Sequence, residues 1–257
     1  MADVGTRCAQ GSPCWASLMT RDLEAACRFY GPLLGWEFGP GATRIGPYVR
    51  ALVDGEPVAG LGELNPKLGF SVAWTTYLAA DNADEVAQRI REYAGTVAVG
   101  PLDADKEGRL VLASDLFGAV FGVWEGLRHP GWQRHGVPGS VAWCALDAAN
   151  VRGSASFYAG VFGMAAMEVS PDRAELRAAD GGRHGVPAVV TRPAGAEELP
   201  PPRWRICFTV ADVDATAARA EELGGAVLQP PIERPWGRVA VLRDREGEDF
   251  SITDRVM

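Results

Sequence analysis

The sequence has few of the residues that would direct a protein to nucleic acid, metal or membrane. Lysine occurs only as Lys67 and Lys106, histidine occurs three times in 257 residues, and the formal net charge is −8. This charge argues against a nucleic-acid partner, because a phosphate backbone attracts basic surfaces. The chain has no apolar run of about 18 residues, so we expect no membrane-spanning helix and no membrane partner.

Cysteine is also scarce, and its pattern excludes a disulfide framework. The odd number and the irregular spacing do not suggest pairs. The N-terminal stretch lacks a basic start followed by an apolar run, so we expect no secretory signal and a reducing, cytoplasmic location. The five cysteines are Cys8, Cys14, Cys27, Cys144 and Cys207.

What the sequence does contain is an internal repeat. Apolar residues make up 47% of the chain, enough for one large core or two of ordinary size. Three anchor pairs recur at offsets of 128, 130 and 129 residues, which indicates two homologous halves. The pairs are Tyr30 with Tyr158, Trp74 with Trp204, and Gly118 with Gly247.

Each half alternates short apolar strands with amphipathic helices. In the first half, "DLEAACRFYGPLLG" predicts a helix that ends at Gly35, and "YVRALVDGEPVAGL" predicts a hairpin that turns at Asp54–Gly55. A second strand, a second helix and two further strands follow. The stretch 126–140 is rich in Gly, Pro and His and reads as a linker. We therefore expect an α+β protein with domains at 10–127 and 138–257.

Four motifs together resemble a known superfamily. They are "LEAACRFYGPLLGW", "ASDLFGAVFGVWEG", "RGSASFYAGVFGM" and "LRDREGEDFSIT". Over roughly residues 13–255 the chain is similar to the vicinal oxygen chelate superfamily of glyoxalases, bleomycin-resistance proteins and extradiol dioxygenases, in its two-domain actinobacterial form. The resemblance implies two tandem glyoxalase-like domains, each of two paired βαβββ modules that form a cup around a small molecule.

The same resemblance shows what is missing from the cups. Metal-binding members carry two His and one Glu at three cup positions in a domain. Trp and Gly offer no ligand atom there, Arg stays charged, and Thr and Ser are poor ligands alone. We therefore expect no metal and no cofactor. The matching residues are Trp15, Thr75 and Gly122 in the first half, and Trp143, Arg205 and Ser251 in the second.

The remaining candidate ligands are isolated. His129 and His135 stand in the linker and His184 in an expected hairpin tip, where solvent-facing loop residues are a simpler interpretation than an alternative metal site. Glu63 could match the extra carboxylate of the glyoxalase branch, but without His partners it reads as a charge at a strand end.

Strand alternation assigns side chains to the cups. In the first half, Trp15, Ser17, Tyr77 and Trp124 face inward with Thr75, and Gly122 leaves room beside them. Such aromatic walls suit a planar, mostly apolar ligand. The alternative is that these aromatic side chains pack against each other as ordinary core.

In the second half the same counting places Arg205, Cys207, Asp249 and Ser251 inward, together with Trp143. Arg205 could hold an acidic ligand group, or form an ion pair with Asp249 or Asp147. Cys207 reads as a core cysteine, because no His is placed to activate it. The acidic stretch "DREGED" predicts a solvated turn.

Two functions remain open from the sequence. The first is a metal-free binding protein for an aromatic or polyketide-like metabolite, in antibiotic resistance or secondary metabolism. The second is a metal-independent enzyme or accessory protein, in which Tyr77, Arg205 or Asp249 would serve as acid–base groups. No glycine-rich phosphate loop or other cofactor signature is present. The expected partner is a small aromatic metabolite, with the chain a monomer or a homodimer.

Overall fold

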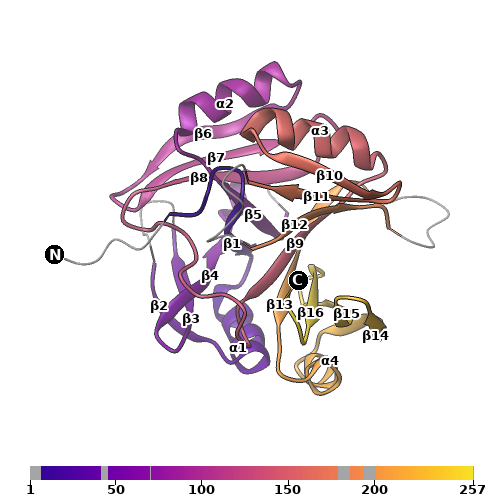
Figure 1. The fold of residues 1–257 in the computed structure, drawn as a ribbon. Helices are drawn as coiled ribbons and strands as arrows, with labels where there is room; N and C mark the ends of the chain where they lie inside the picture. The colour runs from indigo at the N-terminus through magenta and orange to yellow at the C-terminus, as the bar shows by residue number, and fades with distance from the viewer. Residues whose placement is uncertain (1–6, 42–45, 70, 179–185, 194–200, 257) are drawn as a thin grey trace. The chain divides into compact units, whose positions relative to one another are not determined.

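The computed structural model describes residues 7–41, 46–69, 71–178, 186–193 and 201–256. Its first half contains two strand–helix–three-strand modules in sequence, joined by a short 3₁₀ turn (Figure 1). These elements are β1 (Pro13–Thr20), α1 (Leu23–Leu34), β2 (Glu37–Pro40), β3 (Tyr48–Val53), β4 (Glu56–Glu63), η1 (Pro66–Leu68), β5 (Ala73–Ala79), α2 (Ala83–Glu92), β6 (Thr96–Ala104), β7 (Gly108–Ser114) and β8 (Val120–Gly126).

The second half repeats the pattern. Its elements are β9 (Val141–Asp147), α3 (Val151–Phe162), β10 (Ala165–Ser170), β11 (Arg173–Arg177), β12 (Ala188–Thr191), β13 (Arg203–Thr209), α4 (Val213–Glu222), β14 (Ala226–Arg234), β15 (Gly237–Arg243) and β16 (Asp249–Thr253). The expected α+β class and the four βαβββ modules are thus confirmed.

The strands form two sheets with the same order. One sheet runs β2-β3-β4-β1-β5-β8-β7-β6 and the other β10-β11-β12-β9-β13-β16-β15-β14. Within each module the first strand pairs in parallel with the last, and the other pairs are antiparallel. The helix of each module supplies the crossover that a parallel pair requires.

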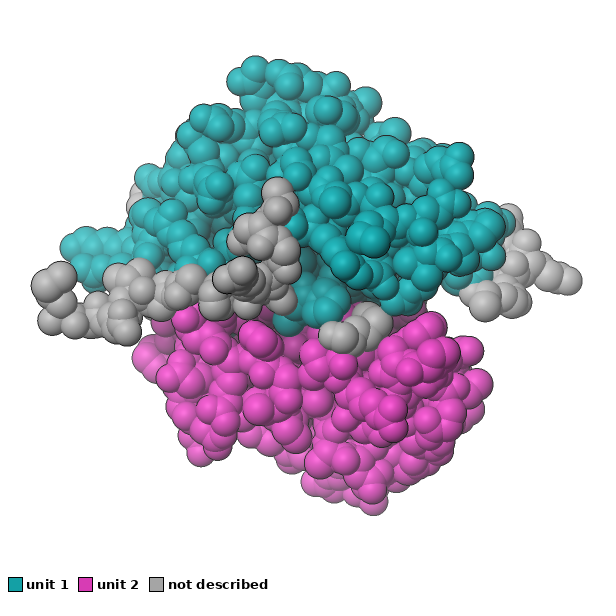
Figure 2. All heavy atoms as spheres, in the orientation of Figure 1, with its two compact units in different colours: residues 1–15, 75–131, 144–204 teal, residues 16–74, 132–143, 205–257 magenta. Residues whose placement is uncertain are grey.

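By its contacts the chain divides into two compact units, coloured in Figure 2. Unit 1 comprises the described parts of residues 1–15, 75–131 and 144–204, and unit 2 those of 16–74, 132–143 and 205–257. Each unit therefore combines one module from each half of the sequence. The domain boundaries at 10–127 and 138–257 stay a prediction about the sequence repeat.

Local signals start and stop the helices where the sequence predicted them. Asp22 and Asn82 are the N-caps of α1 and α2, and their side chains accept hydrogen bonds from the first-turn amides. Gly35 ends α1 in the left-handed conformation, with φ of 71°. The predicted hairpin also forms, because Asp54 and Gly55 both take positive φ at the turn between β3 and β4.

A buried tyrosine organises the core of unit 2. The Tyr30 hydroxyl on α1 donates a hydrogen bond to Asp244 at 2.9 Å and accepts one from Trp74 Nε1 at 3.0 Å. Asp244 also accepts from the amides of Glu246 and Glu248 at 2.9 Å, which shapes the turn between β15 and β16. Burial raises the pKa of Tyr30 well above its usual value, and the nearby Asp244 charge raises it further.

Unit 1 contains the matching cluster. Tyr158 on α3 donates to Asp115 at 3.3 Å and accepts from Trp204 Nε1 at 2.9 Å. Burial again raises the pKa of the tyrosine, and also that of Asp115. In both clusters the Tyr and Trp come from one half of the sequence and the Asp from the other. Each core therefore contains an anchor Tyr and an anchor Trp of one half together with an Asp of the other half.

The acidic stretch "DREGED" is not the solvated turn that the sequence predicted. Besides the bonds of Asp244, the carboxylate of Glu246 accepts hydrogen bonds from the Arg21 amide at 3.1 Å and from the Thr20 hydroxyl. Glu248 accepts from the Trp74 amide at 3.1 Å. These acidic groups serve as acceptors for backbone amides and a hydroxyl group of the same unit.

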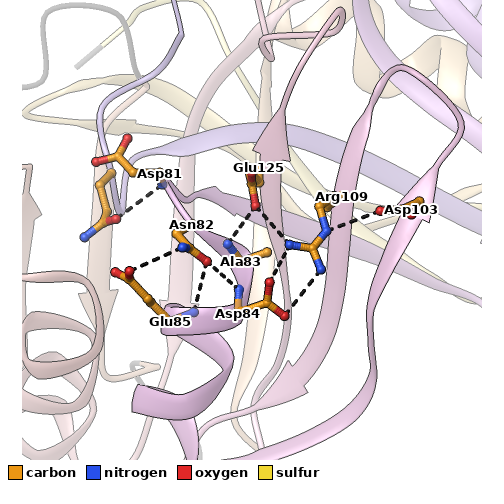
Figure 3. A network of polar contacts seen from close by, with 9 residues as sticks. Asp81, Asn82, Ala83, Asp84, Glu85, Asp103, Arg109 and Glu125 are labelled. Carbon is orange, nitrogen blue, oxygen red and sulfur yellow. Dashed lines mark hydrogen bonds and ion pairs between the residues drawn. The ribbon is translucent and has the colours of Figure 1, made fainter.

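An ion-pair network fastens β8 to the start of α2, as Figure 3 shows. Glu125 at the end of β8 accepts from the Ala83 amide at 2.8 Å and lies 3.6 Å from Arg109 on β7. Arg109 also contacts the carboxylates of Asp84 and Asp103, and its hydrogen bonds lower the pKa of Asp84. The network fixes the strand that carries Gly122 and Trp124.

Candidate functional site

Among the first-half candidates in unit 1, Thr75 and Tyr77 on β5 and Gly122 and Trp124 on β8 lie on the face that α2 does not cover, and Trp15 lies on β1. Tyr77 is opposite Gly122, and Gly122 is opposite Leu112. The alternate residues Thr76 and Phe121 are fully buried on the other face, where α2 packs against β7 and β8. The strand parity predicted from the sequence is therefore confirmed.

The space above Gly122 is already filled. A Cβ atom at this position would lie 2.2 Å from Cδ1, 2.4 Å from Cε1 and 2.7 Å from Cγ of Tyr77. The prediction that Gly122 leaves room for a ligand is wrong in this respect. The missing side chain instead lets the Tyr77 ring lie close against the sheet.

Trp15 on β1 and Trp124 on β8 pack as core. Trp15 and Trp124 are 4% and 8% exposed. The His129 ring lies edge-on to Trp15, with centroids 4.3 Å apart, and 5.8 Å from the Trp124 ring. Trp124 Nε1 also donates to the His129 carbonyl at 2.8 Å. His129 is thus not a solvent-facing loop residue, and the packing favours the core alternative for both tryptophans.

The other end of the same face is accessible. Thr75, Tyr77 and Leu112 are half-buried, and Val120 is 57% exposed. Val120 is one pleat before Gly122 on β8, and its exposed fraction could not be read from the sequence. These side chains are uncharged, so this end of the face offers a ring, a hydroxyl and aliphatic surface.

Ser17 lies in unit 2, where it meets a residue that the sequence reasoning missed. Ser17 is 3% exposed, and its hydroxyl is 2.7 Å from the hydroxyl of Tyr48 on β3. A signal for this arrangement was present as Gly60 and Gly62, two glycines at period two on β4.

The second-half candidates of unit 2 are mostly buried. Trp143, Cys207 and Ser251 are all at most 5% exposed, whereas Arg205 is half-buried. Cys207 is opposite Ser251 on β16, in agreement with the predicted parity. Burial of Cys207 agrees with its interpretation as a core cysteine.

Asp249 forms a bidentate ion pair with Arg243. Its carboxylate accepts from Arg243 Nε at 2.6 Å and from a terminal guanidinium nitrogen at 3.2 Å. The two residues are directly opposite on β16 and β15. Asp147, the other acid considered as a partner for Arg205, accepts from Thr191 Oγ1 at 3.3 Å.

The residues at the metal-ligand positions do not fit a metal centre. Trp15 packs against His129, Gly122 has no side chain, and the Arg205 guanidinium can donate hydrogen bonds but offers no acceptor or ligand atom. Within the described ranges, no three His, Cys, Asp or Glu side chains are grouped to hold an ion. Glu63 is exposed at the end of β4, His135 is exposed, and His184 lies outside the described residues.

Comparisons with known proteins agree with this architecture. A family model described as a glyoxalase-like domain matches residues 143–253. The chain is 34% identical to the anthracycline biosynthesis protein DauV of Streptomyces sp. (strain C5), covering 97% of this chain and 95% of the relative. It is 33% identical to the putative glyoxylase CFP32 of Mycobacterium bovis (strain ATCC BAA-935 / AF2122/97), covering 95% and 94%.

Two solved structures share the fold at low sequence identity. The Mn(II)-bound glyoxalase from Novosphingobium aromaticivorans matches with a TM-score of 0.66 and 16% identity, over 97% of this chain and 84% of that one. The 2,3-dioxygenase LapB from Pseudomonas sp. KL28 matches with a TM-score of 0.62 and 14% identity, over 95% and 93%.

In the described part of this chain, no helix is long and apolar enough to cross a membrane.

Proposed function

Since the chain belongs to the vicinal oxygen chelate superfamily, we propose that it is a metal-free binding protein for a planar aromatic or polyketide-like metabolite. Relatives from two Streptomyces strains that are 34% identical are named anthracycline biosynthesis proteins, which supports a place in secondary metabolism or antibiotic resistance. A planar polyketide is consistent both with the names of these relatives and with the uncharged, partly aromatic surface on unit 1.

The observation that carries the proposal is the accessible end of that face. The Tyr77 ring lies against Gly122, beside the half-buried Thr75 and the exposed Val120. A flat ring that stacks on Tyr77 gains roughly 0.5–1.5 kcal/mol beyond the burial of its area. Because the neighbouring side chains are uncharged, the face favours a neutral ring system over a charged one.

The proposal derives no step from a metal. Superfamily members such as the Mn(II) glyoxalase bind a metal ion, but this chain has Trp15, Thr75 and Gly122 at the corresponding first-half positions. Its residues can stack on a ligand, donate a hydroxyl hydrogen bond and exclude water. These actions suffice for sequestration or presentation of a metabolite.

A titration with 1,8-dihydroxyanthraquinone, followed by tryptophan fluorescence, tests the proposal. We expect saturable binding to protein treated with chelator, and recovery of the probe chemically unchanged. Tyr77→Ala should weaken binding about tenfold, because stacking and apolar burial are both lost. Tyr93→Ala is the matched control and should bind as the wild type does, because Tyr93 is the C-cap of α2 and its ring lies over Gly160 on α3, away from Tyr77.

Three results would contradict it. Absence of binding would remove the ligand class, and conversion of the probe would show an enzyme. Elemental analysis that finds one transition-metal ion per chain after chelator treatment would contradict the metal-free part.

A further inference from the structure

A second set of residues in unit 2 is built around Tyr48. Ser17 and Met19 on β1 pair with Gly60 and Gly62 on β4 in the sheet register, and Tyr48 on β3 pairs with Gly62. These side chains therefore share one face of three neighbouring strands. The two glycines form the floor of that face.

Both glycines are required by the position of the tyrosine ring. A Cβ atom at Gly60 would lie 1.7 Å from the Tyr48 hydroxyl oxygen, and one at Gly62 would lie 2.9 Å from Tyr48 Cδ2. Neither glycine has a positive φ, so space rather than backbone conformation accounts for them. The ring thus lies across the backbone of β4.

Ser17 fixes the position of the Tyr48 hydroxyl group. Its hydroxyl is nearly fully buried and lies 2.7 Å from the Tyr48 hydroxyl, while the Tyr48 side chain is only half-buried. The serine is a positioning residue and the tyrosine presents the accessible groups. A phenol hydroxyl both donates and accepts hydrogen bonds, which suits a ring hydroxyl group on a ligand, because that group does the same.

The fold itself does not demand this set. In the second half, Ala145 on β9 pairs with Val189 on β12, at the places that Ser17 and Gly60 hold in the first half. The same strands therefore form without the glycine floor and without the serine.

We propose that the Ser17–Tyr48 hydroxyl pair recognises a ring hydroxyl group on a planar aromatic ligand. This inference rests on the proposed function, because it assumes a ligand of that class. It places a second contact set for this ligand class in unit 2, where Tyr48 would distinguish hydroxylated rings from unhydroxylated ones. A neutral hydrogen bond of this kind corresponds to about a 2- to 13-fold preference.

Two probes of the same ring system separate recognition from simple stacking. We would measure dissociation constants for 1,8-dihydroxyanthraquinone and for unsubstituted 9,10-anthraquinone, and use their ratio. The wild type should prefer the dihydroxy probe. Tyr48→Phe should reduce that preference about fivefold and change the affinity for anthraquinone by less than about twofold.

Gly60→Ala retains both hydroxyls but moves the ring, so it should reduce the same preference. Tyr93→Phe, at an exposed tyrosine on the other unit, is the control, and thermal unfolding checks that each variant folds. If both probes bind and Tyr48→Phe leaves the ratio unchanged, the inference is wrong and the proposed function stands. If neither probe binds to the wild type, both are overturned.

Discussion

The two halves of the sequence build the same sheet face twice, once open and once closed. In the first half, Val120 at the start of β8 is 57% exposed and Tyr77 is half-buried. At the equivalent second-half positions, Asp249 is 5% and Cys207 is 1% exposed. The backbone pairing is the same, so the difference comes from the side chains and from what covers them.

An ion pair between two side chains covers the closed face of the second half. Arg243 and Asp249 are directly opposite on β15 and β16 and form a two-pronged ion pair there. At the same register in the first half, Ser114 is opposite Val120. A duplicated fold can thus close one face with side chains and leave the equivalent face accessible, because different side chains occupy the two faces.

The largest expected effect tests whether the two units differ only at these faces. Burial raises the pKa of Tyr30 and Tyr158, so above about pH 10 the unfolded chain loses two protons that the folded chain keeps. The unfolding free energy should then fall as pH rises, by about 1.4 kcal/mol per pH unit for each tyrosine. Denaturant unfolding between pH 9 and 11 measures it.

Phenylalanine variants divide this slope between the units. Tyr30→Phe and Tyr158→Phe should each remove about half of it, because the two clusters are alike. Burial also raises the pKa of Cys14, and that of Cys144 to about 12, which adds a slope that begins above about pH 8.5 in both variants. A slope change in only one variant would show that the cores differ as well.

The second prediction concerns the glycine of the open face. Gly122→Ala places a Cβ atom 2.2 Å from the Tyr77 ring, so we expect a destabilisation of about 1–3 kcal/mol from overpacking. The equivalent second-half change, Ser251→Ala, creates no such contact and should cost less than about 1 kcal/mol. The double variant Gly122→Ala with Tyr77→Ala should recover part of the loss. Equal costs for Gly122→Ala and Ser251→Ala would remove the distinction between the faces.

The sequence predicted the fold in detail because its signals are local or repeated. The helix stop at Gly35, the turn at Asp54–Gly55 and the strand parity around Tyr77 each depend on residues close together in the chain. The anchor pair Tyr30 and Tyr158 also identified two residues that form the cores. That each tyrosine bonds an Asp from the other half of the sequence could not be deduced without the tertiary structure.

The candidate site was predicted less well because side-chain packing decides it. Parity placed Gly122 and Tyr77 on one face but could not show that the ring fills the glycine's space. The position of His129 depends on the path of a linker without periodic pattern. Tyr48 was missed because its meaning depends on glycines of another strand.

The third prediction transfers the ion pair to the open face. The double variant Ser114→Arg with Val120→Asp reproduces the Arg243–Asp249 arrangement at the same register. It should weaken binding of the anthraquinone probe about tenfold, since charge now covers the accessible end, and change stability by less than about 1 kcal/mol. Val120→Ala is the control for loss of the valine alone. Unchanged affinity in the double variant would show that the ligand does not use this end.

The smallest effect is expected at the buried end of the same face. Trp124 packs against His129 and donates its indole hydrogen bond to the His129 carbonyl, so it has little surface to offer a ligand. Trp124→Phe keeps an aromatic ring there and should change probe affinity by less than about twofold, whereas loss of the indole bond should lower stability by about 1 kcal/mol. Fluorescence titration and thermal unfolding of the same sample separate the two. A tenfold loss of affinity with unchanged stability would instead show that the ligand stacks on Trp124. It would then bind at the end of the face where Trp124 packs against His129.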